Sequence, residues 1–131
     1  LNGVSPDEHD FIFGDVFDWS QRLARKCRKF DVVVLDPPTF SRSKQGGAFR
    51  AAKDYGRLVK SCLPLLSKGG VLFASTNAAG LTPPAFLKAV ESALESSGRR
   101  LLRQQYFPQP PDFPICRAEP GYLKTIWLAV E

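Results

Sequence analysis

Two apolar runs without polar alternation constrain the fold of this chain more than any other feature of its sequence. DVVVLD spans residues 31–36, and GGVLFAST spans residues 69–76. A strand with one solvated face alternates apolar and polar residues, whereas a continuous apolar run is typical of a strand that is buried on both faces. We therefore expect both runs to be buried strands of a sheet that is covered by helices.

Helical patterns alternate with apolar runs along the chain. We expect strands at residues 11–16, 31–36, 69–76, 100–107 and 122–130, helices at residues 19–29, 52–67 and 83–98, and loops at residues 37–49 and 108–121. Pro64 is expected to kink or shorten the second helix, and Gly98 to end the third. Alternation of this kind indicates an α/β fold with a mainly parallel sheet. The last strand follows a loop and not a helix, so it can lie antiparallel to its neighbour.

Length and composition limit the class of protein. The 131 residues suffice for one domain with one modest core. No run approaches the roughly 18 apolar residues that span a bilayer, and the N-terminus has no signal-peptide pattern. Three scattered cysteines and a single histidine disfavour a zinc site and a disulfide framework. We expect a soluble cytoplasmic protein without a metal.

Basic residues are concentrated in three segments of the sequence. The net charge is +5, and lysines and arginines cluster within residues 22–29, 42–60 and 99–103. A polyanionic partner such as RNA suits this distribution. Solvated helix faces are the alternative explanation.

The segment DVVVLDPPTF, residues 31–40, ends an apolar strand on a carboxylate and two prolines. Ligands of parallel sheets bind at the carboxyl ends of the strands, where Asp36 is expected. Pro37 and Pro38 have fixed φ angles and no N–H, so the carbonyls there can accept hydrogen bonds from an amino group. Phe40 can stack on a flat base. The alternatives are a turn without chemistry and a Walker B strand, but the P-loop that a Walker B strand requires is absent.

These motifs resemble a known family. The segments FIFGDVFDW, FDVVVLDPPTFSRSK, LLSKGGVLFAST, DFP and EPGYLKTIWLAV are similar to the C-terminal portion of class I S-adenosylmethionine-dependent methyltransferases. Within that family the chain resembles the large-subunit ribosomal RNA methyltransferases related to RlmI and to the C-terminal half of RlmKL. The resemblance covers nearly the whole chain. It implies a Rossmann-like sheet, S-adenosyl-L-methionine as cofactor and ribosomal RNA as partner.

The resemblance also implies residues that bind the cofactor. Asp15 matches the acid that these enzymes place near the adenine amino group, and Val16 and Phe17 would flank the adenine ring. Asp36 would lie close to the methyl group. For Asp15, an ordinary carboxylate at a helix N-terminus is the alternative interpretation.

The target base is expected at the next two loops. Asp36, Pro37 and Pro38 match the catalytic motif, and Phe40 would pack at the base pocket. Ser75, Thr76 and Asn77 match the loop that forms the far wall of the pocket, although a polar turn would look the same. Arg42, Lys44 and Arg50, beyond the catalytic motif, could contact phosphates.

The sequence departs from the family in its cofactor motif. It contains no GxGxxG turn and no acid after a second strand, and the family carries both upstream. We therefore expect residues 1–131 to form one partial domain, the C-terminal part of a methyltransferase catalytic domain. On its own it should bind the cofactor weakly or not at all, and the surface left open could support self-association.

A second departure concerns the reaction. In the family, cytosine C5 methylation uses a cysteine nucleophile in one of the two central loops. Neither loop contains cysteine here, and Asn77 stands near the expected position. Cys27 and Cys62 fall in expected helices and resemble buried apolar residues, and Cys116 lies in a late loop. A base nitrogen such as guanine N7 is therefore favoured over C5. An exocyclic amine is less favoured, because Thr39 and not an aromatic residue follows the two prolines.

The sequence thus predicts a methyltransferase that acts on a base nitrogen of RNA, most simply 23S ribosomal RNA. Two alternatives remain open at this point. One is a methyltransferase fold without activity that serves as an RNA-binding or assembly module. The other is a methyltransferase for cytosine C5, for a small molecule or for a protein, because a fold does not specify a substrate.

Overall fold

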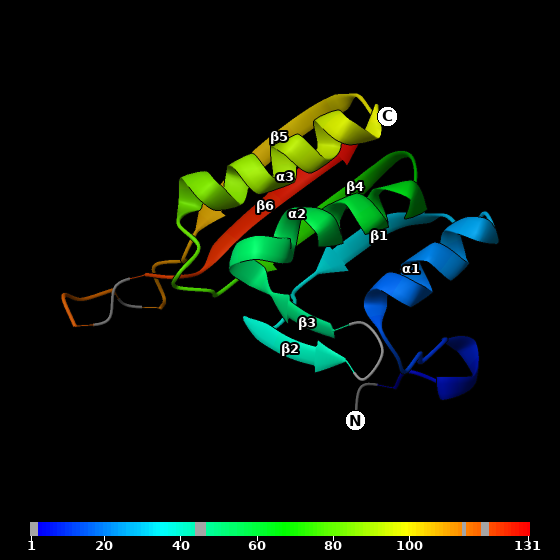
Figure 1. Cartoon of the computed structure of the whole chain (residues 1–131), viewed down its shortest axis with the longest axis horizontal. Helices are drawn as coiled ribbons and strands as arrows, with labels where there is room; N and C mark the ends of the chain where they lie inside the picture. Colours follow the sequence, from blue (N-terminus) through cyan, green and yellow to red (C-terminus); the bar gives the residue numbers. More distant parts are fainter. Residues whose placement is uncertain (1–2, 44–46, 114, 119–120) are drawn as a thin grey trace.

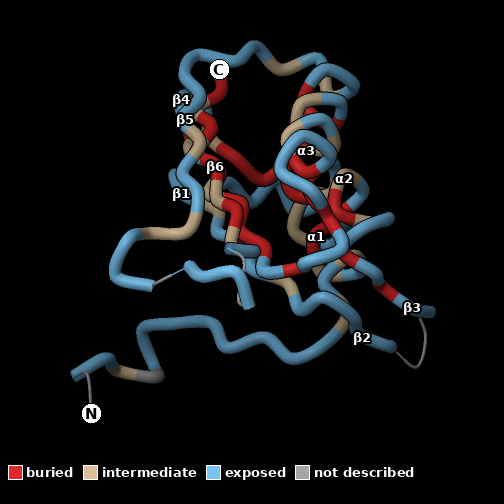
Figure 2. The backbone as a smooth tube through the Cα atoms, turned by 90° about the vertical axis from the view of Figure 1, so that its left-hand side faces the viewer, coloured by how far each residue is buried: buried red, intermediate tan, exposed pale blue. Residues whose placement is uncertain are grey.

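A four-stranded mixed sheet carries the α-helices of the chain on one of its faces (Figures 1 and 2). The computed structural model describes residues 3–43, 47–113, 115–118 and 121–131. The strand order is β1-β4-β6-β5, with β1 at Phe30–Leu35, β4 at Leu66–Thr76, β6 at Lys124–Val130 and β5 at Leu101–Pro108. β1 and β4 are parallel, and β6 is antiparallel to both of its neighbours. The predicted antiparallel last strand is therefore confirmed. The expected mainly parallel sheet is wrong for the described strands, because β6 inserts between β4 and β5 and only β1–β4 is a parallel pair.

The remaining elements are helices and a hairpin. The α-helices are α1 at Val16–Arg25, α2 at Ala51–Cys62 and α3 at Pro83–Ser97, the 3-10 turns are η1 at Pro6–Glu8 and η2 at Leu63–Leu65, and β2 at Phe40–Ser43 pairs with β3 at Gly47–Arg50. No helix among the described residues is both long and apolar enough to cross a membrane.

Local sequence signals explain where the helices begin and end. Asp15 begins α1, since its carboxylate accepts hydrogen bonds from the backbone N–H groups of Phe17 and Asp18. Pro64 ends α2, which continues only as the 3-10 turn η2. Gly98 ends α3 in the left-handed conformation, with φ at 70°.

The core lies between the helices and one face of the sheet. Figure 2 shows buried segments of β4 and β6 opposite α2 and α3. Tyr55 of α2 and Phe86 of α3 meet edge to face, with ring centroids 5.0 Å apart. Both are fully buried, as are Leu72 and Leu128 on the facing strands. Burial of this apolar face is the main source of stability for the fold.

The hydroxyl of Tyr55 joins the ends of the two parallel strands. It donates to the carbonyl oxygen of Ser75 at 2.6 Å and lies 3.3 Å from the carbonyl oxygen of Leu35. Burial raises the pKa of Tyr55, and the nearby Asp36 carboxylate raises it further. The side chain therefore stays neutral and keeps its proton for these carbonyls.

Arg99 ties together the opposite end of the sheet. Its guanidinium donates to the carbonyl oxygens of Leu63, Leu66, Ser67 and Glu131, at 2.8 to 2.9 Å. These carbonyls belong to η2, to the start of β4 and to the end of the chain. This member of the third basic segment is thus a structural residue, so its positive charge is no argument for an RNA contact.

The second face of the sheet is open, which corrects the expectation of strands buried on both faces. Val32 and Val34 of β1 and Trp127 of β6 are exposed, Val34 by 61%. Phe73 of β4 packs beside Trp127, with ring centroids 4.6 Å apart. No other described residues cover the apolar surface that these side chains form. The continuous apolar run in β1 predicts burial on both faces. Among the described elements, only one face of the sheet is covered by helices.

Three other expectations differ from the structure. Residues 11–16 form no strand, because no described strand lies beside them to accept their hydrogen bonds; Phe13 is fully exposed. The expected loop at 37–49 contains the hairpin β2–β3. The first helix covers Val16–Arg25 and not 19–29, since Asp15 caps it early and Cys27 beyond it has a φ of 53°.

Replacing Tyr55 by phenylalanine tests the link between β1 and β4. We expect a loss of about 1 to 3 kcal/mol in the free energy of unfolding, because the buried carbonyl of Ser75 loses its donor and that of Leu35 loses a longer contact with the same hydroxyl. The folded-state pKa of Tyr55 is raised, so its contribution is fully present below its ordinary pKa of about 10 and is lost as the pH rises further. The measurement is urea unfolding of both proteins at about pH 7 and about pH 11.

Tyr122→Phe is the matched control, because Tyr122 is exposed. It should change the free energy of unfolding by less than about 0.5 kcal/mol at either pH. A deficit for Tyr55→Phe that is equally large at both pH values would contradict the assigned role of the hydroxyl proton.

Candidate active site

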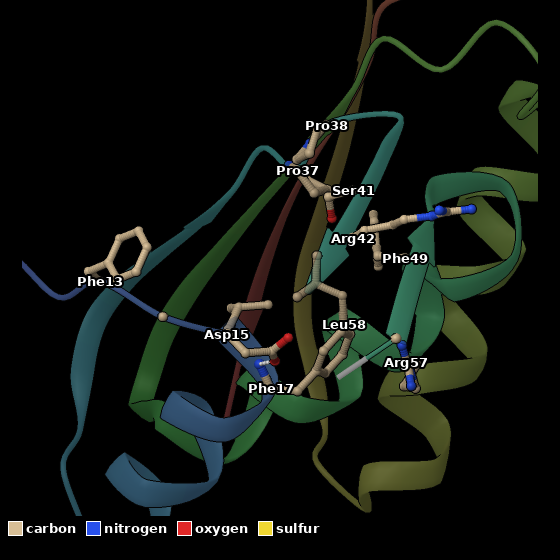
Figure 3. Close-up of a pocket in the computed structure, with 13 residues that line it drawn as sticks. Phe13, Asp15, Phe17, Pro37, Pro38, Ser41, Arg42, Phe49, Arg57 and Leu58 are labelled. Atoms are coloured by element: carbon tan, nitrogen blue, oxygen red, sulfur yellow. Dashed lines mark hydrogen bonds between the residues drawn. The ribbon is translucent and has the colours of Figure 1, made fainter. Parts of the chain in front are cut away.

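One cavity brings together two segments that the sequence singles out. It has a volume of about 750 Å³ and lies between the start of α1, the double proline after β1, the hairpin β2–β3 and α2. Asp15, Val16 and Phe17 line one side, and Pro37 and Pro38 line another. Figure 3 shows Asp15 and Phe17 near Leu58 of α2, with the prolines above them. The volume falls in the range of small-molecule sites, roughly 300 to 1,000 Å³.

Asp15 combines the two roles that its sequence context suggests. Its Oδ1 atom accepts the N–H groups of Phe17 at 2.8 Å and Asp18 at 3.4 Å, so the side chain caps α1. The residue also lines the cavity. Both capping bonds use one oxygen, and the geometry is therefore compatible with a ligand donor at Oδ2.

Gly14 and Trp19 shape the chain that leads to Asp15. The Trp19 indole N–H donates to the carbonyl oxygen of Phe13 at 3.2 Å. Gly14 has a φ of 147°, and a Cβ atom there would lie only 2.6 Å from the indole nitrogen. This position therefore requires glycine, and the indole keeps the segment along the cavity wall.

The loops after β1 and β4 meet at the carboxyl ends of these strands. The hydroxyl of Thr39 donates to Oδ1 of Asn77 at 3.3 Å. Asp36 is exposed beside this contact, and it does not line the cavity. The predicted proximity of Asp36, Pro37, Pro38 and Asn77 at one edge of the sheet follows from the parallel pairing of β1 and β4.

The hairpin supplies the third wall. Ser41 and Arg42 line the cavity, whereas Phe40 does not. Phe49 of β3 is buried there and lies 6.3 Å from Phe17, centroid to centroid. Lys44, the other expected substrate contact, lies outside the described residues.

Arg57 of α2 was not singled out by the sequence. Its guanidinium carbon lies 4.1 Å from the centroid of the Phe17 ring, and it faces the cavity (Figure 3). Asp54 holds the same guanidinium at 3.7 Å. The sequence gives no reason to choose Arg57 over the other basic residues of the second segment. Its packing against Phe17, which only the structure shows, distinguishes it from them.

Lys124 supports the loop after β4. The side chain is 3% exposed, and its Nζ donates to the carbonyl oxygen of Ala78 at 2.9 Å. Thr76 contributes a second bond, because its hydroxyl accepts the N–H of Ala78 at 3.2 Å. Desolvation lowers the pKa of Lys124. The lysine of the GYLK motif thus has a structural function that the sequence alone did not suggest.

No cysteine lines the cavity among the residues that the structure describes. Cys62 is buried at the end of α2, as expected, whereas Cys27 is exposed beyond the end of α1, which corrects the expectation of a buried residue. Cys116 is exposed in the loop between β5 and β6. Within the described part of the chain, no group of three or more His, Cys, Asp or Glu residues is placed to hold a metal ion.

Comparison with known proteins identifies the family. A profile described as S-adenosylmethionine-dependent methyltransferase matches residues 1–128. The chain belongs to this methyltransferase family. Its predicted family and fold class are therefore confirmed, and so is S-adenosylmethionine as the cofactor of the family.

The relatives of this methyltransferase chain are longer proteins. It is 34% identical over 133 residues to a ribosomal RNA large subunit methyltransferase of Deinococcus radiodurans, covering 100% of this chain and 32% of the relative. It is 38% identical over 130 residues to ribosomal RNA large subunit methyltransferase I of Aeromonas salmonicida, covering 96% and 32%. The chain thus spans about a third of the length of each of these two curated relatives.

A solved structure supports the same fold. The crystal structure of SMU.776 in complex with SAH has a TM-score of 0.75 and 34% sequence identity, over 89% of this chain and 30% of that one. SAH is S-adenosylhomocysteine, the demethylated form of the family cofactor. The cavity lined by Asp15, Phe17 and Pro37 has the size and the mixed polar and apolar lining that such a cofactor requires.

Replacing Lys124 by methionine should loosen the loop that carries Asn77. A hydrogen bond from a charged donor contributes about 1.5 to 3 kcal/mol, so amide exchange at residues 77–80 should become roughly tenfold faster or more. Hydrogen exchange read by mass spectrometry measures this directly.

Lys68→Met is the control for this experiment. Lys68 is highly exposed and forms an ion pair with Glu131 at 3.6 Å, so its loss should leave exchange at residues 77–80 unchanged. Equal exchange in Lys124→Met and the parent protein would show that Lys124 does not hold the loop.

Proposed function

We propose that the full-length protein transfers a methyl group from S-adenosylmethionine to a base nitrogen of large-subunit (23S) ribosomal RNA, and that residues 1–131 are the C-terminal part of its catalytic domain. The observation that carries this proposal is the cavity that joins Asp15–Phe17 to Pro37–Pro38. The relatives named as ribosomal RNA large subunit methyltransferases support the substrate class.

Asp15, Val16 and Phe17 would form the adenine side of the cofactor site. Asp15 has one carboxylate oxygen engaged by α1, so the other can accept the adenine amino group. Phe17 offers a ring face, and Arg57 on that ring adds positive charge to the wall. When bound, the cofactor supplies an electrophilic methyl group on a sulfonium ion. The glycine-rich turn of the family is not part of this sequence and would come from upstream.

The edge formed by Asp36, Pro37 and Pro38 would position the target base. Asp36 is exposed, so its carboxylate can accept hydrogen bonds from a base amino group. The prolines cannot donate, which leaves acceptors facing the site. Asn77, held by Thr39, would form the far wall. Positioning of a base lone pair in line with the methyl group is the main requirement of the reaction.

The position of the cysteines favours a nitrogen as the methylated atom, with guanine N7 as the leading candidate. Cytosine C5 must first be activated by addition of a nucleophile to the ring. Cys62 is buried at the end of α2, and Cys27 follows α1 at the amino end of β1, far along the strand from Asp36. Cys116 is exposed in the loop between β5 and β6, and among the described residues it does not line the cavity. A ring nitrogen carries its own lone pair and needs no such step.

A second candidate function is an RNA-binding or assembly module without catalysis. The open sheet face with Val32, Val34 and Trp127 favours it, because an apolar surface of this kind suits docking of another chain or a second copy.

Methyl transfer tests the proposed function directly. The full-length gene product should bind S-adenosylmethionine with micromolar affinity by calorimetry and transfer the methyl group to unmodified 23S ribosomal RNA. Asp36→Ala should lower the transfer rate by about 100-fold through loss of base positioning. Asp7→Ala, an exposed carboxylate in η1, is the control and should retain the parent rate. No cofactor binding by the full-length protein would favour the assembly module.

Asp15→Asn separates the two roles of Asp15. Asparagine caps a helix about as well as aspartate, so the stability of the protein should change by less than about 0.5 kcal/mol. The amide loses the negative charge, and S-adenosylmethionine binding should weaken by roughly tenfold. Asp15→Ala should lower both stability and affinity. Unchanged affinity in Asp15→Asn would assign Asp15 to the helix cap alone.

A further inference from the structure

We propose that the outer face of the β2–β3 hairpin binds one unpaired nucleotide next to the target base. This surface, here called the hairpin platform, consists of Phe40, Arg42 and Arg50. The proposal rests on the proposed function for its ligand class, RNA. It adds that the RNA is single-stranded at the site, and that Phe40 contacts the neighbour of the target base and not the target itself.

Strand pairing places the three platform residues on one face. Phe40 lies opposite Arg50, Ser41 opposite Phe49, and Arg42 opposite Ala48. Side chains alternate between the two faces of a strand, and directly paired residues share a face. Ser41 and Phe49 therefore face one way, toward the cavity. The platform residues face the other way, and Arg42, at the margin between the two faces, also lines the cavity.

The exposure of the two phenylalanines in the hairpin agrees with this division. Phe49 is 8% exposed and packs in the core beside Phe17. Phe40 is 46% exposed, although it is equally apolar. Only Thr39 separates the hairpin from the double proline, and the hairpin leads directly into α2 (Figure 1). Both of its ends are therefore attached to elements that line the cavity.

Two guanidinium groups flank the exposed ring. The guanidinium carbons of Arg42 and Arg50 lie 5.7 and 5.4 Å from the centroid of Phe40. Within the described residues neither guanidinium forms an ion pair; Asp54 accepts the backbone N–H of Arg50 and pairs with Arg57 instead. The platform thus has an apolar ring with two cations over it, and within the described residues neither cation has an acidic partner. The guanidinium planes and the ring can stack on a base, and the cations can contact phosphates.

This combination matches an unpaired nucleotide. An aromatic ring stacks on any base, and arginines beside it bind the phosphates on either side. A base inside a duplex is already stacked on its neighbours and cannot offer its face, which favours single-stranded RNA. An acidic protein would satisfy the arginines but would gain little from the exposed ring.

The platform adjoins the cavity. Arg42 belongs to both, because it flanks Phe40 and also lines the cavity with Pro37 and Pro38. Ser41, between the two platform residues of β2, faces the cavity (Figure 3). A nucleotide stacked on Phe40 would therefore lie beside a base held at the double proline.

RNA binding by the full-length gene product tests the platform. The probe is a fluorescein-labelled single-stranded RNA of about 12 nucleotides, compared by anisotropy with its own duplex. Phe40→Leu should weaken single-strand binding by about 5- to 150-fold, the usual effect of removing one stacking ring, without changing the salt dependence. Arg42→Ala and Arg50→Ala should each lower the slope of log K against log salt by about 0.7.

Two further variants make the result interpretable. Phe40→Trp keeps a stacking ring and should keep the affinity, so a loss in Phe40→Leu alone cannot come from misfolding. Arg28→Ala is the matched control, because its guanidinium carbon also lies near a ring, 5.8 Å from the centroid of Phe30, at the far end of β1. It should leave single-strand binding unchanged.

Two outcomes would overturn the platform: equal binding of single strand and duplex, or equal binding by Phe40→Leu and the parent protein. These outcomes are separate from a failure of the proposed function. A protein that binds no S-adenosylmethionine but loses RNA affinity in Phe40→Leu has the platform without the reaction. If the parent protein and Phe40→Leu methylate RNA equally well at low RNA concentration, the protein has the reaction without the platform.

Discussion

The buried hydroxyl of Tyr55 is the contact on which the geometry of the site depends. It reaches from α2 to the carbonyls of Leu35 and Ser75, which are at the ends of β1 and β4. The loops that follow these strands carry the double proline and Asn77. One rigid side chain thus fixes the ends of β1 and β4 relative to α2. The cavity between these strand ends and α2 therefore has a defined shape. Lys124 extends this support by holding Ala78.

The cavity is assembled from parts that do not contribute equally to the fold. Its floor is made by core residues such as Phe49 and Leu58, which are buried and held by packing. Its rim is made by exposed side chains such as Arg42, Arg57 and Pro38, and these are available to ligands. A rigid floor with an accessible rim suits a site that must orient two partners, a cofactor and a base, at the same time.

The open face of the sheet and the hairpin platform expose apolar groups for different reasons. Val34 and Trp127 lie in a broad row across β1 and β6, where burial by another layer would add stability. Phe40 is a single ring between two arginines, which is unsuited to a hydrophobic interface but suited to a nucleotide. The first surface is therefore suited to packing against another layer, and the second is suited to the nucleotide of the proposal above.

Hydrophobic periodicity and helix-ending residues determined most of the secondary structure, because these signals act over a few residues. Pro64 and Gly98 ended their helices as expected, and the alternation of apolar runs with helical patterns led to the correct fold class. The DPPTF motif marked one edge of the sheet correctly. Tertiary structure alone decided which faces are buried and that residues 11–16 lack a strand partner. It also decided that Arg57 lines the cavity, that Lys124 holds the loop after β4 and that Arg99 joins carbonyls of the scaffold. Those properties depend on contacts between segments that are distant along the chain. The type of a residue does not by itself determine which distant residues it contacts.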